Sequence, residues 1–189
     1  MQSKTYAIAR DHLPLEMIAC KNNNVQPTRS VTLIASPGSG GIVTASEVSA
    51  QCGSDSVCTV PPGITVRMVG AIGLNVGALI VRGVVEWNEV ESAPDLRFLC
   101  AGYVAVEGLG RFTMDVRIGR AYVYIKDNYA VHPQLRSRAF GGVATSPGDY
   151  PVVEISGRPM ARTWSLLSKP LVIGDRMMML MHNANLMGW

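Results

Sequence analysis

The sequence predicts an all-β fold built as an antiparallel β-sandwich. Several short runs alternate apolar and polar residues, which is the period of a strand with one buried face. Turns rich in glycine and proline separate these runs, with 19 Gly and 11 Pro in 189 residues. Neither a convincing amphipathic helix nor an internal repeat is evident. Many short strands joined by such turns are typical of a sandwich.

An N-terminal arm over residues 1–29 precedes the body of the predicted domain. The arm contains KNNNVQPTR and few apolar positions, which indicates an extended or loosely attached segment. The body begins near Ser30 with a strand over residues 30–36. Residues 41–50 predict either a second strand or a continuation of the first beyond a bend. Residues 64–74 are compatible with a short helix or a strand.

The segment Gly77–Gly108 predicts a β-hairpin, because two alternating apolar runs flank a short acidic connection that contains proline. In the second run both faces are largely apolar, which suits a strand covered on either side. Trp87 and Leu79 are expected to point into the sandwich. The residues that share the buried face of the first run are Leu79, Val81, Val85 and Trp87.

The rest of the chain supplies further strands. Residues 111–125 alternate up to Gly119, where a shift of phase predicts a bulge or bend. Residues 126–150 are rich in turn-forming residues and predict a long connection. The last strands are expected at 151–157, 161–167 and 169–181.

The hairpin resembles the central hairpin of the jelly-roll coat proteins of icosahedral picorna-like viruses, and more narrowly of the plant secovirids. The similarity lies in a Gly-led strand, a loop with Asn and Pro, and a second strand written L-x-A-x-Y-V. Gly40–Ala50 resembles an early strand of those proteins, and Glu154–Pro159 with Ser168–Asp175 resembles their closing strands. The resemblance implies a jelly-roll β-sandwich of the viral capsid type over residues 30–189, similar to the small coat subunits of cheraviruses and comoviruses.

The composition favours large protein–protein contacts. Charged residues make up only 16% of the chain and hydrophobic residues 48%, which is little charge for an isolated soluble monomer. The sequence contains no run of about 18 uncharged apolar residues, so no membrane-spanning helix is predicted. The charged N-terminus lacks the apolar centre of a secretory signal, so no signal peptide is predicted. A chain that stays inside a cell is expected to keep its cysteines reduced. Free thiols are therefore predicted for Cys20, Cys52, Cys58 and Cys100, with a Cys52–Cys58 bridge as the alternative.

The motifs of catalysis are missing from the sequence, so we predict neither an enzyme nor a cofactor. Glycine spacing does not match a phosphate-binding loop, and neither Cys52 nor Cys100 stands in a protease-like nucleophile loop. The three histidines form no metal-ligand pair, so no metal site is predicted and they are interpreted as surface or turn residues. They are His12, His132 and His182.

The expected partners are other capsid subunits, and viral RNA only weakly. The net charge of +3 is small, and the basic residues of the arm are scattered, which argues against strong RNA binding. The candidate RNA-facing residues are Lys4, Arg10, Lys21 and Arg29. The Met-rich terminus predicts either a core strand or a subunit contact. The candidate contact residues are Met177, Met179, Met181 and Trp189.

The resemblance thus implies a structural coat subunit of a small icosahedral plant RNA virus, located in the virion and, during assembly, in the host cytoplasm. The alternative is a carbohydrate- or ligand-binding jelly-roll domain without catalytic activity. A lectin needs exposed aromatic platforms, and aromatic residues make up only 6% of the chain.

Overall fold

The computed structural model describes Cys20 and residues 25–68, 73–88, 96–117 and 120–157. All of them belong to one compact unit, Pro14–Gly157. Their strands form three sheets, in which every ladder is parallel.

The spatial order of the strands is as follows. Sheet A contains β1 (Arg29–Thr32), β3 (Ser56–Val60), β6 (Ala78–Val81), β9 (Val104–Glu107) and β12 (Phe140–Val143). Sheet B contains β13 (Val152–Gly157), β10 (Arg111–Val116), β7 (Val84–Asn88), β4 (Thr65–Arg67) and β2 (Ile42–Thr44). Sheet C contains β11 (Arg120–Ile125), β8 (Leu96–Ala101) and β5 (Gly73–Asn75). The helix α2 (Ala45–Gln51) follows β2.

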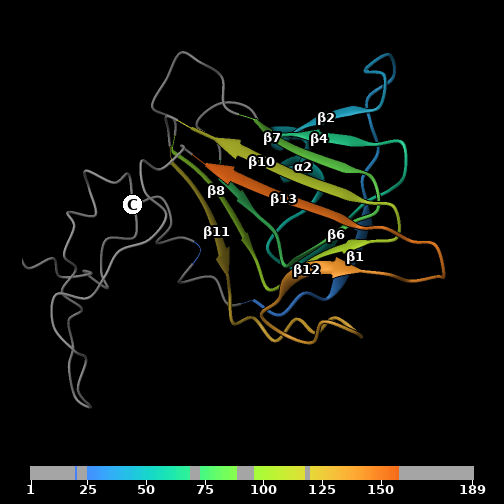
Figure 1. Cartoon of the computed structure of the whole chain (residues 1–189). Coiled ribbons are helices and arrows are strands. Elements are labelled where there is room, and N and C mark those ends of the chain that lie inside the picture. Colours follow the sequence, from blue (N-terminus) through green and yellow to red (C-terminus); the bar gives the residue numbers. More distant parts are fainter. Residues whose placement is uncertain (1–19, 21–24, 69–72, 89–95, 118–119, 158–189) are drawn as a thin grey trace, which may run out of the picture. The chain divides into compact units, whose positions relative to one another are not determined.

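The chain winds through the three sheets in a constant order. From β3 onward each turn visits sheets A, B and C in succession, and the next turn stacks on it in register. In the first turn α2 takes the place of a strand of sheet C and packs against β5. This arrangement, visible in Figure 1, is a three-sided parallel β-helix, a solenoid in which each turn contacts its neighbours.

The predicted antiparallel jelly-roll β-sandwich is therefore wrong, because a jelly roll is antiparallel and all three sheets here are parallel. Alternation favoured an antiparallel sheet because parallel sheets are usually covered on both faces and read as continuous apolar runs. In this solenoid one face of sheet B lines the interior and the other carries residues such as Arg67 and Glu86, which form an ion pair at 3.3 Å. A parallel sheet with one solvated face gives the same alternation as an antiparallel one.

The predicted hairpin over Gly77–Gly108 is also absent. Its first run divides into β6 and β7, which belong to different sheets, and β6 pairs in parallel with β9. The division falls at Gly83, where an added Cβ would overlap the carbonyl oxygens of Pro61 and Ile64. Glycine therefore allows the corner to lie against the previous turn.

Apolar side chains from all three sheets fill the interior of the solenoid. The predicted burial of Trp87 and Leu79 is confirmed, since they are 0% and 2% exposed. The largest members of this core are Leu33, Leu74, Leu79, Trp87, Leu99 and Phe112. Phe112 meets Phe140 edge to face, with 5.1 Å between ring centroids, which joins sheets B and A inside the last turns.

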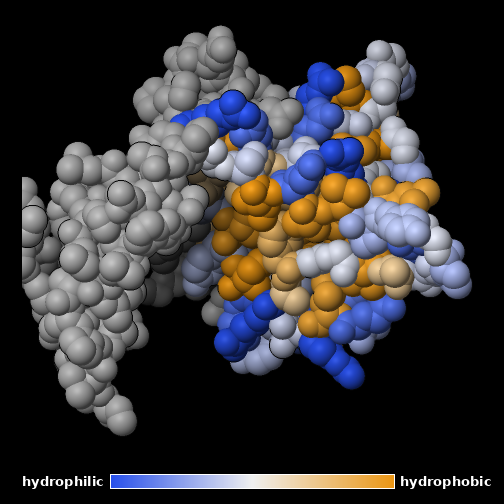
Figure 2. Space-filling model, viewed as in Figure 1, coloured by the Kyte–Doolittle hydropathy of each residue, from blue (hydrophilic) through white to orange (hydrophobic). Residues whose placement is uncertain are grey.

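At the C-terminal end of the described solenoid, inward-facing residues are exposed. Val153 and Ile155 align with Phe112 and Met114 of the turn below, and Ile155 is 53% exposed. Figure 2 shows hydrophobic residues gathered in the region of β10 and β13. A cavity of about 330 Å³ opens there. Its lining residues are Met114, Val116, Ala121, Tyr122, Ile155, Ser156 and Gly157.

At the other end, α2 begins with a capping box. The hydroxyl of Thr44 accepts a hydrogen bond from the N–H of Glu47, and the Glu47 carboxylate accepts one from the N–H of Thr44. The sequence pattern does not predict this helix, because only two of its residues, Ala45 and Val48, are buried, which is too few to show a helical period.

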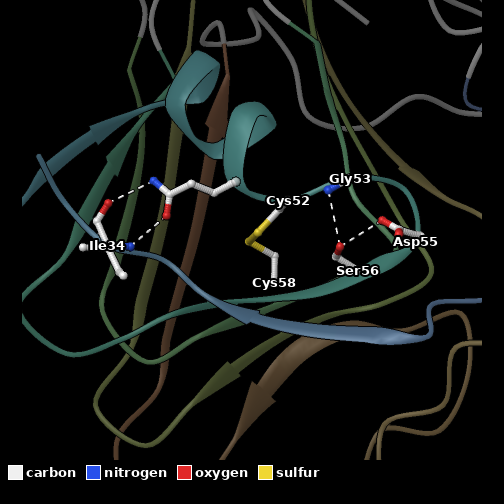
Figure 3. The surroundings of a disulfide bond; sticks show 7 residues. Ile34, Cys52, Gly53, Asp55, Ser56 and Cys58 are labelled. Atoms are coloured by element: carbon white, nitrogen blue, oxygen red, sulfur yellow. Dashed lines mark hydrogen bonds between the residues drawn. A yellow bond between two sulfur atoms is a disulfide. The ribbon is translucent and has the colours of Figure 1, made fainter.

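Two disulfides replace the predicted free thiols, and none of the described cysteines is free. Cys52, which ends α2, is bonded to Cys58 of β3 (Figure 3). Beside this bond the Gln51 side chain bonds both backbone groups of Ile34, each at 2.9 Å. The second disulfide joins Cys20 to Cys100 of β8. The two pairs have Cα–Cα distances of 5.9 and 5.8 Å, within the ordinary range for disulfides.

Candidate functional site

The connection from sheet C to sheet A differs between turns. It is formed by Val76 and Gly77 in one turn and by Gly102 and Tyr103 in the next. Between β11 and β12 it expands to residues 126–139, which we call the strap. The strap covers part of the outer face of sheet A. There Ala130 packs in a small apolar cluster with Ala78, Tyr103 and Ala105, and Leu135 packs against it.

Buried polar bonds anchor the base of the strap to the turns below. The Asn128 amide donates to the carbonyl of Gly77 at 2.8 Å. An added Cβ at Gly102 would overlap the Asn128 side chain, so glycine at this corner makes room for the anchor. Lys126, which is 1% exposed, donates from Nζ to Oδ1 of Asn75 at 2.8 Å. The strap is thus fixed by side chains that are themselves inside the protein.

A carboxylate–imidazole pair holds the middle of the strap. His132 Nε2 lies 2.9 Å from Oε1 of Glu107, and the two side chains are 2% and 7% exposed. The other oxygen of Glu107 accepts from Nε of Arg82 at 2.7 Å. Nδ1 of His132 accepts from the backbone N–H groups of Gln134 and Leu135, at 3.2 and 3.1 Å. Each nitrogen of the imidazole is therefore used to hold the strap.

The charges of this cluster explain two pKa shifts. Burial raises the pKa of Glu107, but the hydrogen bonds from His132 and Arg82 and the charge of Arg82 outweigh it, so the pKa is lowered overall. Desolvation raises the pKa of Tyr103, and the negative charge of Glu107 adds to the effect. The ring of Tyr103 meets the ring of His132 edge to face at 5.3 Å. The cluster therefore contains an ionised carboxylate beside a neutral phenol at neutral pH.

Backbone strain is concentrated in the strap. The non-glycine residues with left-handed backbone angles in the described part of the chain are Tyr129, Arg136 and Arg138, with φ of 59°, 68° and 53°. L-residues with a Cβ rarely adopt such angles, and tyrosine has no side-chain group that favours them. Strained residues of this kind persist only where the surrounding structure holds them, and they cluster at functional sites.

Beside the strained tyrosine lies a cavity of about 320 Å³, which we call the groove. Tyr129 is 72% exposed, so most of its ring is available to a partner, whereas Tyr103 forms the buried part of the wall. No charged side chain lines the groove among the residues that the structure describes. Its lining residues are Gln26, Pro27, Val57, Tyr103, Tyr129, Ala130 and Val131.

The candidate contact and RNA-facing residues predicted from the sequence do not form this site. Arg29 is the first residue of β1. Its Nη1 lies 3.5 Å from Oδ2 of Asp55, so the guanidinium forms an ion pair with that carboxylate. The other selected residues lie outside the described part of the chain. They are Lys4, Arg10, Lys21, Met177, Met179, Met181 and Trp189.

His132 was expected to be a surface or turn residue, and it lies in a turn but is buried. The groove and the Glu107–His132 pair were missed altogether. The one signal for them was the length of the connection over 126–150, since long ordered loops often carry function.

Within the described ranges, no group of three or more His, Cys, Asp or Glu side chains is placed to hold a metal ion. Nor does that part of the chain contain a helix long and apolar enough to cross a bilayer. The arrangement is suited to binding a neutral molecule against an aromatic ring.

Comparisons of the chain with protein-family models, with curated proteins and with solved structures found no match.

Proposed function

We propose that this chain is a non-catalytic carbohydrate-binding module, and that its ligand is a neutral oligosaccharide bound in the groove. The observation that carries the proposal is Tyr129, an exposed aromatic ring held in a left-handed conformation beside a cavity of about 320 Å³. This retains the ligand-binding alternative of the sequence analysis on a different fold, since function belongs to a site and not to a fold.

The chemistry of the groove supports a sugar. Tyrosine combines a large apolar ring with a polar hydroxyl, so it can pack on the C–H face of a sugar ring and bond a hydroxyl group. Gln26 supplies an amide, and Pro27 and Val57 supply apolar wall. A charged ligand would find no counter-charge among the lining residues, which favours a neutral one. The anchored strap holds Tyr129 in place before the ligand arrives, which lowers the entropic cost of binding.

The acid and base groups nearest the groove argue against catalysis. The side chains of Glu107 and of His132, which belongs to the strap, are buried, and their polar atoms are occupied by Arg82, by backbone amides and by each other. A general acid or base must come within hydrogen-bond reach of the substrate. The pair is better suited to holding the strap than to proton transfer.

The two disulfides support a location in an oxidising compartment. Structural disulfides are rare where glutathione keeps thiols reduced, and common in secreted and extracellular proteins. Cys20–Cys100 and Cys52–Cys58 together use all four cysteines of the chain. We propose an extracellular or secretory location in place of the cytoplasmic one. The coat-subunit function depended on a jelly roll, which these residues do not form, and we do not propose it.

The proposal is tested by calorimetric titration of the full chain with a panel of neutral hexasaccharides from β- and α-linked glucans, xylan and chitin. At least one is expected to bind, and Tyr129→Ala should weaken it by roughly tenfold or more, in line with the loss of one stacking ring. Tyr150→Ala is the matched control, because Tyr150 is 76% exposed and outside the groove. If the panel fails and an apolar peptide library instead yields ligands that depend on Tyr129, the groove is a peptide site and the carbohydrate proposal is overturned.

A further inference from the structure

Tyr129 is an exposed residue between two buried ones. Its own exposed fraction is 72%, whereas Asn128 and Ala130 on either side are 1% and 5% exposed. Its φ of 59° lies in the left-handed region, which is unfavourable for a residue with a Cβ unless a contact compensates for it. The tyrosine side chain offers no short polar group that could bond the local backbone. The cause of the left-handed conformation therefore lies in its neighbours.

The side chain of Asn128 closes a turn around Tyr129. Its Oδ1 accepts a hydrogen bond at 3.3 Å from the N–H of Ala130, two residues further along the chain. This is an Asx turn, in which the side-chain carbonyl replaces the first carbonyl of a β-turn. Tyr129 then occupies the third position of that turn, which in types II and I′ requires a positive φ. The carbonyl of Asn128 thus favours the backbone angle that Tyr129 adopts.

The amide nitrogen of the same side chain bonds an earlier turn of the solenoid. Nδ2 of Asn128 donates to the carbonyl oxygen of Gly77 at 2.8 Å, and this bond is buried. The N–H of Gly102 donates to the same oxygen at 2.8 Å. A Cβ added to Gly102 would lie 1.9 Å from Oδ1 of Asn128, so glycine leaves room for the amide here. One bond needs an acceptor and the other a donor, and the carboxamide of asparagine supplies both.

Gly77 also supports another part of the groove lining. A Cβ added to Gly77 would lie 2.7 Å from Cβ of Pro27, so Pro27 packs closely against this corner. Pro27 and Tyr129 both line the groove, and Asn128 does not. Since Pro27 contacts Gly77 and Asn128 bonds it, both parts of the lining are seated on one residue. The bond from Asn128 therefore fixes the strap relative to Pro27.

We propose that Asn128 is the positioning residue of the groove. It sets the left-handed backbone of Tyr129 through Oδ1 and the location of the strap through Nδ2, and it does so without touching the ligand. The aromatic ring is then held in its binding position before a ligand arrives, which lowers the conformational entropy that binding removes. The effect on a sugar rests on the proposed function, whereas the conformation of Tyr129 in the free protein does not.

The first test uses the wild-type chain without ligand. NMR should show a strong nuclear Overhauser effect between the amide and α protons of Tyr129, which marks a positive φ. The backbone order parameter of Tyr129 should be about 0.85, as in a rigid strand. An order parameter below about 0.6 would overturn the proposal, because the ring would then not be held in advance.

Asn128→Ala removes both bonds of the side chain. The Overhauser effect of Tyr129 should weaken and its order parameter should fall, because its backbone can then leave the left-handed region. A Tyr129 that stays left-handed and rigid in this variant would overturn the role of Asn128. Should Asn128→Ala not fold, the same loss is expected in Asn128→Ser, whose hydroxyl closes such a turn only weakly and is too short to reach Gly77.

Thr44→Ala is the matched control for a general loss of stability. It weakens the cap of α2 and leaves the strap unchanged. Its Tyr129 signals and its affinity for sugar should equal those of the wild type. If they change as in Asn128→Ala, the effect follows stability alone and the positioning role is overturned.

The effect on binding is measured by calorimetric titration with the hexasaccharide that the panel identifies. Asn128→Ala should bind it roughly tenfold or more weakly than the wild type. Saturating sugar should restore the strong Overhauser effect of Tyr129 in this variant. Equal affinities would overturn the positioning role and leave the proposed function intact. If no sugar binds, but Tyr129 is left-handed and rigid in the wild type and not in Asn128→Ala, the proposed ligand is rejected and the positioning of the ring is retained.

Discussion

Lys126 reaches back across the turn that contains Ala101 to bond Asn75, with 2.8 Å between Nζ and Oδ1. Its backbone N–H bonds the carbonyl of Ala101 at 2.9 Å, so backbone and side chain of one residue tie three turns of sheet C together. No carboxylate is bonded to this ammonium group in the described structure. Burial without a counter-charge lowers the pKa of Lys126 to about 8.

This lowered pKa predicts a gain in stability at alkaline pH. The folded chain gives up the proton of Lys126 more readily than the unfolded chain, so the free energy of unfolding should rise from about pH 8 to about pH 10.5. Allowing for screening by solvent, we expect a rise of about 1–2 kcal/mol. Urea unfolding at several pH values should show it in the wild type and not in Lys126→Met. An equal rise of the unfolding free energy in both proteins would show that titratable groups other than Lys126 cause it.

A second prediction concerns Trp87, whose indole N–H is buried without a hydrogen-bond partner. Trp87→Ala should lower the free energy of unfolding by about 3–5 kcal/mol through loss of a fully buried ring. Trp87→Phe should cost far less, because it also removes the unsatisfied donor, whose burial costs about 1–3 kcal/mol. The two variants are compared by urea unfolding. A cost for Trp87→Phe close to that of the alanine variant would contradict the gain expected from removing the buried donor.

The disulfide pairing gives a third prediction. Peptide mapping without reduction should recover Cys20 linked to Cys100 and Cys52 linked to Cys58, and thiol reagents should find no free cysteine in the unfolded, unreduced chain. Replacing Cys52 and Cys58 by serine should cost about 2 kcal/mol, since the bond closes a short loop. Free thiols in protein purified from an oxidising compartment would contradict the pairing.

A fourth prediction concerns the capping box of α2. Thr44→Ala removes the acceptor for the Glu47 N–H and should cost about 1 kcal/mol of stability. The pKa of Glu47 is lowered, first by the backbone N–H of Thr44 and then by the hydroxyls of Thr44 and Ser36. Its contribution should therefore be lost as the pH falls through this lowered pKa, and less steeply in Thr44→Ala. Thr65→Ala, on the outer face of β4, is a control from the same end of the solenoid. A larger loss in the control would place the effect outside the helix cap.

The sequence showed which side chains are buried but not how the strands pair. The alternation that placed Trp87 and Leu79 inside is local, and it follows from the geometry of any strand with one covered face. Whether a neighbour runs parallel depends on residues far along the chain, as when Val84 pairs with Arg111. The repeat escaped notice because its turns differ in length, with strands of sheet A beginning at Ser56, Ala78, Val104 and Phe140.

The candidate site could not be predicted from local patterns either, because its contacts also join residues far apart in the sequence. The anchor from Asn128 to Gly77 spans 51 positions, and the bond from His132 to Glu107 spans 25. The turn-forming composition of residues 126–150 predicted a connection there, although β12 lies within it. Composition indicates that a loop exists, but the contacts that hold it and expose Tyr129 arise only when distant turns stack.

The strap lengthens a single corner of the winding, while the corners below it need only Val76 with Gly77 and Gly102 with Tyr103. Each turn contributes its own layer to the interior, so lengthening one corner leaves the layers above and below intact. The strap and the stacked strands are thereby encoded in separate stretches of sequence. Substitutions on the outer side of this corner would therefore change the surface around Tyr129 without requiring changes in the strands that fill the interior.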